Sequence, residues 1–296
     1  MTPGSHLRVL RRRSGTVFGW IVVTIFLALV GAACTPPASG PTPTELPPRP
    51  DIPYTVVWSA AEGTDIQSRP AELVRATLDA GEMASWAGTK NSFPGFAEAV
   101  AGTREYFGNW GRPDQPPTPG NRIPVANTVM SRHIASMTVT DTAVTARICT
   151  LRQAVKPAYP PAADAEGSFI GEARPRTLEV QLRKPSGVSA GISGHRDESA
   201  ADHNFRGNDQ PSWNVFGNWS IGAIRDLRGV NDFWGDEPEC VAWWRKKFPG
   251  WTGTTSLDFQ PPHPVNGPWE WYNLLALDPP APPSFPEWIA PKGADA

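Results

Sequence analysis

Residues 177–184 read Thr-Leu-Glu-Val-Gln-Leu-Arg-Lys, and this stretch decides the fold class because apolar and polar side chains alternate along it. Leu178, Val180 and Leu182 share one parity, and the residues between them are polar. Successive side chains of a strand point to opposite faces, so a period of two predicts a half-buried strand. One buried face and one solvated face are typical of an antiparallel sheet.

Three further strands are predicted around this one. Residues 128–139 and 142–151 form a hairpin with Thr140-Asp141 as its turn, and residues 215–227 form the last strand. Residues 54–58 precede them as a short extended lead-in. The residues expected on one face of the last strand are Trp219, Ile221 and Ala223.

Helical patterns come before the strands. A helix is predicted over residues 70–85 with Ser68 as its N-cap, and a shorter helix over residues 94–101. Arg75 and Asp79 stand four residues apart and are expected to form a solvated pair on the outer side of the first helix. Helices followed by a run of strands predict an α+β fold, with N-terminal helices packed on one face of a curved antiparallel sheet.

The N-terminus has the pattern of an export signal. Four arginines precede an uncharged run over residues 16–33, and Cys34 follows three small residues. Residues 1–33 therefore resemble a bacterial lipoprotein signal peptide, which implies cleavage before Cys34 and lipidation of its thiol. Gly31 stands where such signals usually carry Leu. An uncleaved membrane anchor and a soluble secreted form remain as alternatives.

Every version of this signal places the remaining chain outside the cytoplasm. Residues 34–55 are Pro-rich and suit a spacer that holds a domain away from a membrane. The expected location is the outer face of a bacterial cell membrane, with the membrane contacted through the lipid on Cys34.

Charge argues against nucleic acid as a partner. The chain of 296 residues has 27 Lys+Arg and 29 Asp+Glu. Removal of residues 1–33 takes four arginines, so 23 basic residues face 29 acidic ones and the formal net charge becomes -6. Duplex binding needs clustered positive charge, which this composition does not supply.

The remaining cysteines, Cys149 and Cys240, are expected to form a disulfide, as is usual in an oxidising compartment. Free thiols and a metal site are the alternatives. Cys149 has the opposite parity to Val144, Ala146 and Ile148, so the bridge should leave the sheet on the face opposite these three residues.

A Trp- and Pro-rich extension occupies residues 233–296, beyond an α+β domain at residues 56–232. Nine of the 13 Trp lie between residues 213 and 288, and ten Pro lie in residues 261–291, so an irregular extension is predicted. Its rings either anchor the extension by packing or form a surface for a glycan or protein ligand. The candidate residues are Trp243, Trp244, Trp251, Trp269 and Trp271.

Catalytic motifs are missing from the sequence: no Gly-x-Ser-x-Gly, phosphate-binding loop or His-Glu-x-x-His occurs. His133 is read as a structural histidine in a strand. The residues from His195 to His203 include two His and two Asp, and they are read as a solvated loop. We therefore predict neither a cofactor nor a metal.

Three segments resemble the nuclear transport factor 2-like domains found in actinobacterial lipoproteins. They are Ser92–Phe96, Val144–Cys149 and Trp213–Trp219. The resemblance covers roughly residues 56–232 and implies a cone-shaped fold with a pocket between sheet and helices. It names no catalytic residue, and the long extension after residue 233 departs from it.

These observations favour a non-enzymatic lipoprotein that serves as a binding or accessory module of the cell envelope, with an envelope protein or glycan as partner. The alternatives are an isomerase, dehydratase or hydrolase that uses the pocket, or a cell-wall glycan-binding protein. A buried pair of ionisable side chains in the pocket would separate the enzyme alternative from the binding module.

Overall fold

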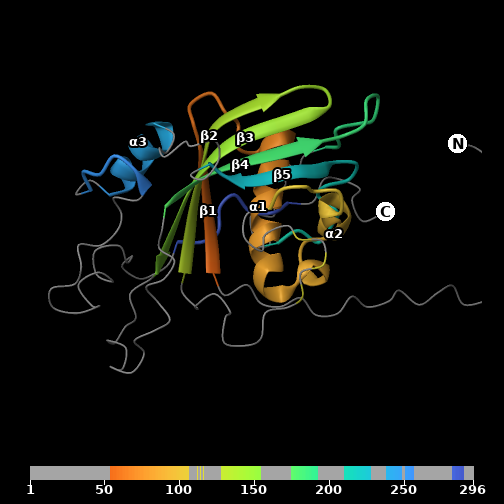
Figure 1. The fold of residues 1–296 in the computed structure, drawn as a ribbon, viewed down its shortest axis with the longest axis horizontal. Coiled ribbons are helices and arrows are strands. Elements are labelled where there is room, and N and C mark those ends of the chain that lie inside the picture. The colour runs from red at the N-terminus through yellow and green to blue at the C-terminus, as the bar shows by residue number, and fades with distance from the viewer. Residues whose placement is uncertain are drawn as a thin grey trace, which may run out of the picture. The chain divides into compact units, whose positions relative to one another are not determined.

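A five-stranded mixed sheet forms the centre of the protein, as an α+β fold requires (Figure 1). Its strands lie in the order β1-β2-β3-β4-β5. A computed structural model describes residues 54–106, 112, 114, 116, 128–154, 175–192, 210–227, 238–248, 251–256 and 282–289. The strands are β1 (Tyr54–Ala60), β2 (Thr128–Val139), β3 (Ala143–Ala154), β4 (Arg176–Arg183) and β5 (Ser220–Asp226).

The period-two pattern predicted the central strands closely. β2 has the predicted bounds, and the β2–β3 turn is closed by a hydrogen bond from the amide of Thr140 to the carbonyl of Ala143 at 2.8 Å. Residues 54–58 are extended as predicted, but they do not merely precede the sheet: residues 54–60 form β1, which pairs in parallel with β2. The helices between β1 and β2 supply the crossover that a parallel pair needs. The sheet is therefore mixed and not wholly antiparallel.

The prediction for the last strand was partly wrong. β5 begins at Ser220, because the Asn214 side chain accepts hydrogen bonds from the amides of Phe216 and Gly217 and holds the preceding residues in a turn. The pairing with β4 also skips Gly222, so a bulge changes the parity of the later β5 residues. Consequently Ile221 and Ile224, and not Ala223, join the main core.

The main helix, α1, spans Arg69–Ala87 and contains the predicted helix. Ser68 precedes it, but its hydroxyl donates to the carbonyl of Asp65 at 2.6 Å and does not cap the helix as predicted. The second predicted helix is shorter, since α2 covers Phe96–Val100. Its start is delayed because Gly95 adopts a left-handed conformation, with φ of 79°. A short 3-10 turn, η1, covers Thr89–Asn91 between the two helices.

The main core lies between α1, α2 and one face of the sheet. The even-numbered residues of β3 and β4 point into it, as the alternation in residues 177–184 predicts. Its fully buried strand residues are Ile134, Val144, Ile148, Leu178, Val180, Leu182 and Ile224.

A second core lies on the opposite face of the sheet, where α3 (Pro238–Lys247) packs on β2 and β3. Figure 1 shows α3 and α1 on opposite sides of the sheet. Cys149 and Cys240 form a disulfide with their Cα atoms 5.1 Å apart, on the predicted face. The extension is thus not irregular throughout, because the apolar residues of α3 recur at helical spacing: Cys240, Val241, Trp243 and Trp244.

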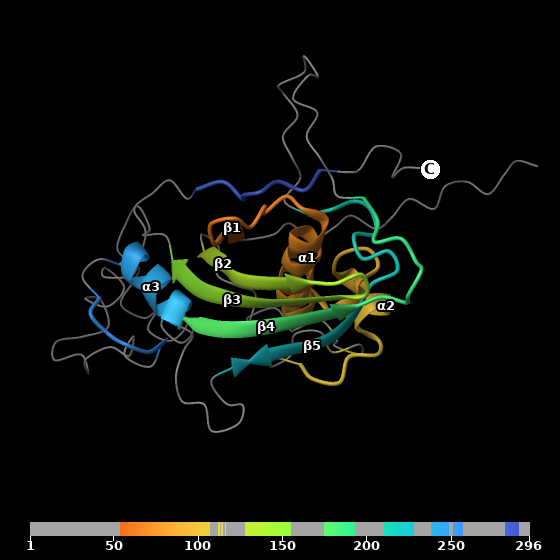
Figure 2. The ribbon, with the colours of Figure 1, turned by 90° about the horizontal axis from the view of Figure 1, so that it is seen from above.

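A segment near the C-terminus, residues 284–288, lies along the outer edge of β1; we name it the strap. Figure 2 shows it as a dark blue ribbon beside the orange β1. The amide of Trp58 donates to the carbonyl of Phe285 at 2.8 Å, and the amide of Phe285 donates to the carbonyl of Val56 at 2.9 Å. The strap therefore covers an edge of the sheet that β2 leaves open.

No helix in the described part of the chain is both long and apolar enough to cross a membrane.

Candidate functional site

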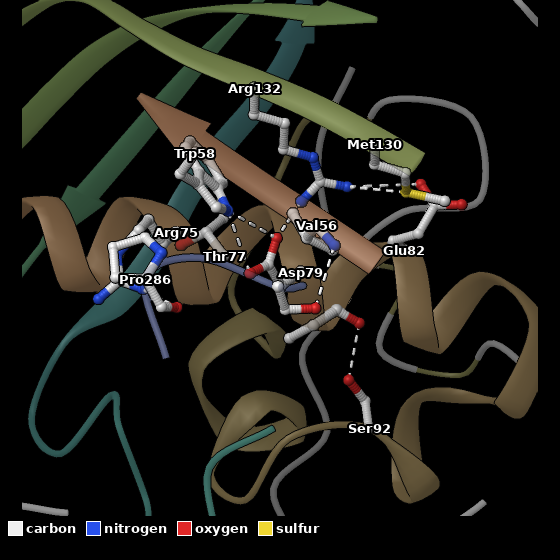
Figure 3. A network of polar contacts seen from close by, with 12 residues as sticks. Val56, Trp58, Arg75, Thr77, Asp79, Glu82, Ser92, Met130, Arg132 and Pro286 are labelled. Atoms are coloured by element: carbon white, nitrogen blue, oxygen red, sulfur yellow. Dashed lines mark hydrogen bonds and ion pairs between the residues drawn. The ribbon is translucent and has the colours of Figure 1, made fainter. Parts of the chain in front are cut away.

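A cluster of charged side chains is buried where α1 faces β1 and β2. Arg132 of β2 forms an ion pair and a hydrogen bond with Asp79 of α1 (Figure 3). Arg132 is only 2% exposed and Asp79 only 5% exposed. The indole N–H of Trp58, from β1, lies 3.2 Å from both carboxylate oxygens of Asp79. The guanidinium of Arg132 also lies over the Trp58 ring, 5.5 Å from its centroid. Three elements thus converge on one carboxylate.

Glu82 extends this cluster along α1 by one further turn. Its carboxylate lies 3.7 Å from Arg132 and 3.8 Å from Arg152 of β3, so it bridges two strands. Arg132 in addition donates to the sulfur of Met130 at 3.6 Å. The cluster therefore has its carboxylates on the helix and its arginines on the strands. Each carboxylate forms an ion pair with at least one of these arginines.

Arg75 lies on the same helix and is the second buried cation. It was predicted to form a solvated pair with Asp79, and that prediction was wrong, since Arg75 is only 4% exposed. The strap covers this side of α1: Arg75 donates to the carbonyl of Pro286 at 3.3 Å and lies over the ring of Trp288, 4.5 Å from its centroid. The face that the sequence pattern assigns to solvent is therefore covered by a segment 211 residues away along the chain.

Burial is the main influence on these ionisable groups. Burial raises the pKa of Asp79, while Arg132, Arg75 and the hydrogen bond from Trp58 oppose that rise. Burial lowers the pKa of Arg75, and the charges of Asp79 and Glu72 oppose the fall. Burial also raises the pKa of the nearby Tyr54, helped by the charge of Glu82. For Asp79 and Arg75, neighbouring opposite charges therefore favour the ionised form against the cost of burial.

Of the tryptophans proposed as a ligand surface, Trp243 and Trp244 are buried and Trp251 is partly buried. Trp243 stacks on the ring of His133 with centroids 5.4 Å apart, and Trp244 donates from its indole to the carbonyl of Thr150 at 3.3 Å. Trp251 meets Trp244 edge to face at 6.3 Å and packs on the second core. These contacts favour the packing alternative for the three rings. Trp269 and Trp271 lie outside the described residues.

The other predicted site residues fall into two groups. His133 lies in β2 as predicted, with its Nδ1 atom 2.9 Å from Ser59 Oγ. Cys34 and the His195–His203 loop lie outside the described residues. Among the residues that are described, no group of three His, Cys, Asp or Glu side chains could hold a metal ion.

Sequence reasoning missed Arg132, Trp58 and Glu82. A signal for Arg132 was present, because it shares the parity of Met130 and Ile134 and both of these face the main core. An arginine among core-facing residues of a strand needs a buried carboxylate, and α1 provides two. Parity in a strand can therefore indicate a buried charge from the sequence alone.

Comparisons with protein-family models, with curated proteins and with solved structures gave no match for this chain.

Proposed function

We propose that this chain is a lipid-anchored lipoprotein of the bacterial cell envelope and that it acts as a binding or accessory module. In this proposal residues 1–33 are removed, Cys34 carries the lipid, and the Pro-rich residues between Cys34 and β1 form the spacer. Residues 56–232 form a nuclear transport factor 2-like, cone-shaped domain, and the extension after residue 233 covers it. The membrane is contacted only through the lipid.

The disulfide is the observation that carries the proposal. It joins β3 to α3 across 91 residues and is buried in the second core. Structural disulfides persist in oxidising compartments and are rare in reducing ones. The disulfide in this second core is therefore expected to persist if the chain is exported to an oxidising compartment.

The geometry of the ionic cluster supports a module without catalytic activity. A general base needs a carboxylate that can reach a ligand. Asp79 instead uses both oxygens on Trp58 and Arg132, and Glu82 lies between Arg132 and Arg152. Asp79 and Arg132 are a buried ionisable pair, but their contacts join helix to sheet, which favours a structural role.

Metabolic labelling with an alkyne fatty acid tests the anchor. The full chain is expressed in an actinobacterium as wild type, Cys34→Ala and Cys149→Ser. We expect label on the wild type and on Cys149→Ser, and none on Cys34→Ala. Cys149→Ser is the matched control because it also removes one cysteine. Label that persists in Cys34→Ala, or a wild-type chain found unlabelled in the cytoplasm, contradicts the proposal.

A further inference from the structure

His133 lies where the C-terminal half of α3 meets the sheet. The ring of Trp243 stacks on its imidazole, with the two planes 11° apart and the centroids 5.4 Å apart. On the neighbouring strand β1, Ser59 Oγ lies 2.9 Å from the Nδ1 atom of His133. The imidazole is thus part of the contact between α3 and the sheet. Histidine is the side chain whose charge changes most readily near neutral pH, so the charge at this contact depends on pH.

The surroundings of this imidazole disfavour a positive charge on it. β1 presents the hydroxyl of Ser59, and β3 presents Cys149, which stands opposite His133 in the strand register and whose sulfur is in the disulfide. α3 presents Lys246 and Lys247. Within the described part of the chain, these two lysines are the charges that act on the imidazole, and no carboxylate opposes them. Burial, helped by the two lysines, therefore lowers the pKa of His133.

α3 is attached to the sheet by different means along its length. In its first turn, Cys240 is bonded covalently to β3. In its C-terminal half the attachments are non-covalent: Trp244 donates from its indole to the carbonyl of Thr150 at 3.3 Å, and Trp243 stacks on His133. A helix of ten residues has little stability of its own, so its C-terminal half depends on these contacts. If they are lost, the disulfide still tethers the first turn.

We propose that α3 is an acid-sensitive flap: protonation of His133 releases its C-terminal half, while the disulfide at Cys240 keeps its first turn on the sheet. Below the ordinary pKa of histidine, about 6.5, the open form binds a proton at His133 more readily than the closed form, so acid shifts the population toward the open form. Opening uncovers Trp243 and Trp244, two of the candidate residues for a ligand surface, which are buried in the closed form. The inference goes beyond the proposed function and does not depend on the lipid anchor.

Two contacts limit the size of the effect, because they favour a protonated imidazole in the closed form. Ser59 Oγ can accept a hydrogen bond from the protonated Nδ1 atom while it donates to the carbonyl of Arg132 at 3.4 Å. An imidazolium also gains from stacking on the indole of Trp243. A tenfold difference in proton affinity between the closed and open forms changes their ratio at most tenfold. We therefore expect the open population of α3 to increase about 3- to 10-fold between about pH 7.5 and about pH 5.0.

Hydrogen exchange of the oxidised full chain in detergent tests the flap at these two pH values, with each rate divided by the intrinsic exchange rate at that pH. The amides to follow are those of residues 242–248, among them Phe248, whose amide donates to the carbonyl of Trp244 at 2.8 Å. The amides of β4 and α1 are the internal reference. We expect the protection of residues 242–248 to fall about 3- to 10-fold at the lower pH while the reference amides keep theirs.

Matched variants identify the trigger. His133→Phe and His133→Gln cannot titrate, so each should give the same protection of residues 242–248 at both pH values, whatever its absolute level. The double change Lys246→Ala with Lys247→Ala replaces two exposed side chains, so the fold should be kept, and it should reduce the pH effect because the like charges are gone. Lys90→Ala is the control, since Lys90 is an exposed cation in η1 that does not act on His133, and it should keep the full effect.

Three results would overturn the inference. The first is a wild-type chain in which residues 242–248 are equally protected at both pH values. The second is a pH effect that persists in both His133 variants, which would assign the trigger to another group. The third is an equal loss of protection in β4 and α1, which would mean that acid unfolds the whole domain and does not open α3 separately.

Discussion

Arg132 and Asp79 are buried together, so each depends on the other for charge compensation. Replacing Arg132 with Met leaves a buried carboxylate without its main partner, and we expect a loss of about 3–5 kcal/mol in the free energy of unfolding. The double change Arg132→Met with Asp79→Leu should recover part of that loss. Urea denaturation checks this. Arg112→Met is the control, because Arg112 and Asp114 are exposed, and it should leave the midpoint unchanged. Equal midpoints for Arg132→Met and the control would contradict the structural role of the pair.

Gly95 is a second position where a single substitution should lower stability, because there is no room for a Cβ atom. Its φ of 79° disfavours any side chain, and a Cβ there would overlap the side chain of Asn214, which holds the turn before β5. We expect Gly95→Ala to cost on the order of 2–3 kcal/mol. Gly63→Ala is the matched control, with φ of 81° and no atom near the new Cβ, and it should cost about 1 kcal/mol. Equal losses in thermal denaturation would refute the steric part of this argument.

His133 predicts a dependence of stability on pH. It lies between Ser59 of β1 and Trp243 of α3, and burial, helped by Lys246 and Lys247, lowers its pKa from the ordinary 6.5. Below about pH 6.5 the unfolded chain then binds more protons at this residue than the folded chain, so the free energy of unfolding decreases as the pH is lowered, until the folded pKa is passed. His133→Phe keeps a stacked ring but cannot titrate. The difference between wild type and His133→Phe should therefore change across this window, and parallel curves from about pH 7 to 4.5 would contradict it.

At the scale of elements, the sequence predicted the features that depend on one local period. β2, β3 and β4 alternate, and α1 carries an apolar stripe, so their positions were predictable. The parallel pairing of β1 was not, because nothing in Tyr54–Ala60 specifies which neighbour it meets. The burial of Arg75 was not either, since it depends on the distant strap. The candidate site was missed for the same reason: its residues come from α1 and from three strands, and no local sequence pattern relates these elements.

α3 is the element that depends most on a covalent bond. Its ten residues are too few for a stable isolated helix, and the disulfide holds Cys240 against β3. We expect Cys149→Ser to reduce the free energy of unfolding by up to about 4–5 kcal/mol, the chain-entropy value for a loop of this length, and usually by less. Non-reducing electrophoresis should show a mobility shift on reduction in wild type that is lost in Cys149→Ser. An identical shift in the variant would contradict the bridge.

At the scale of the whole described body, two cores lie on opposite faces of one sheet and share no residue. The main core contains α1, α2 and the strap anchor Trp288, whereas the second core depends on α3 and its disulfide. Reduction should therefore open the second core before the first, because loss of the bridge removes a constraint from only one face. Hydrogen exchange after reduction under native conditions measures this: the amides of α3 should lose protection while those of α1 and β4 keep theirs. Simultaneous loss at α1 and α3 would mean that the sheet transmits stability between its faces, and the protein would then unfold as one cooperative unit.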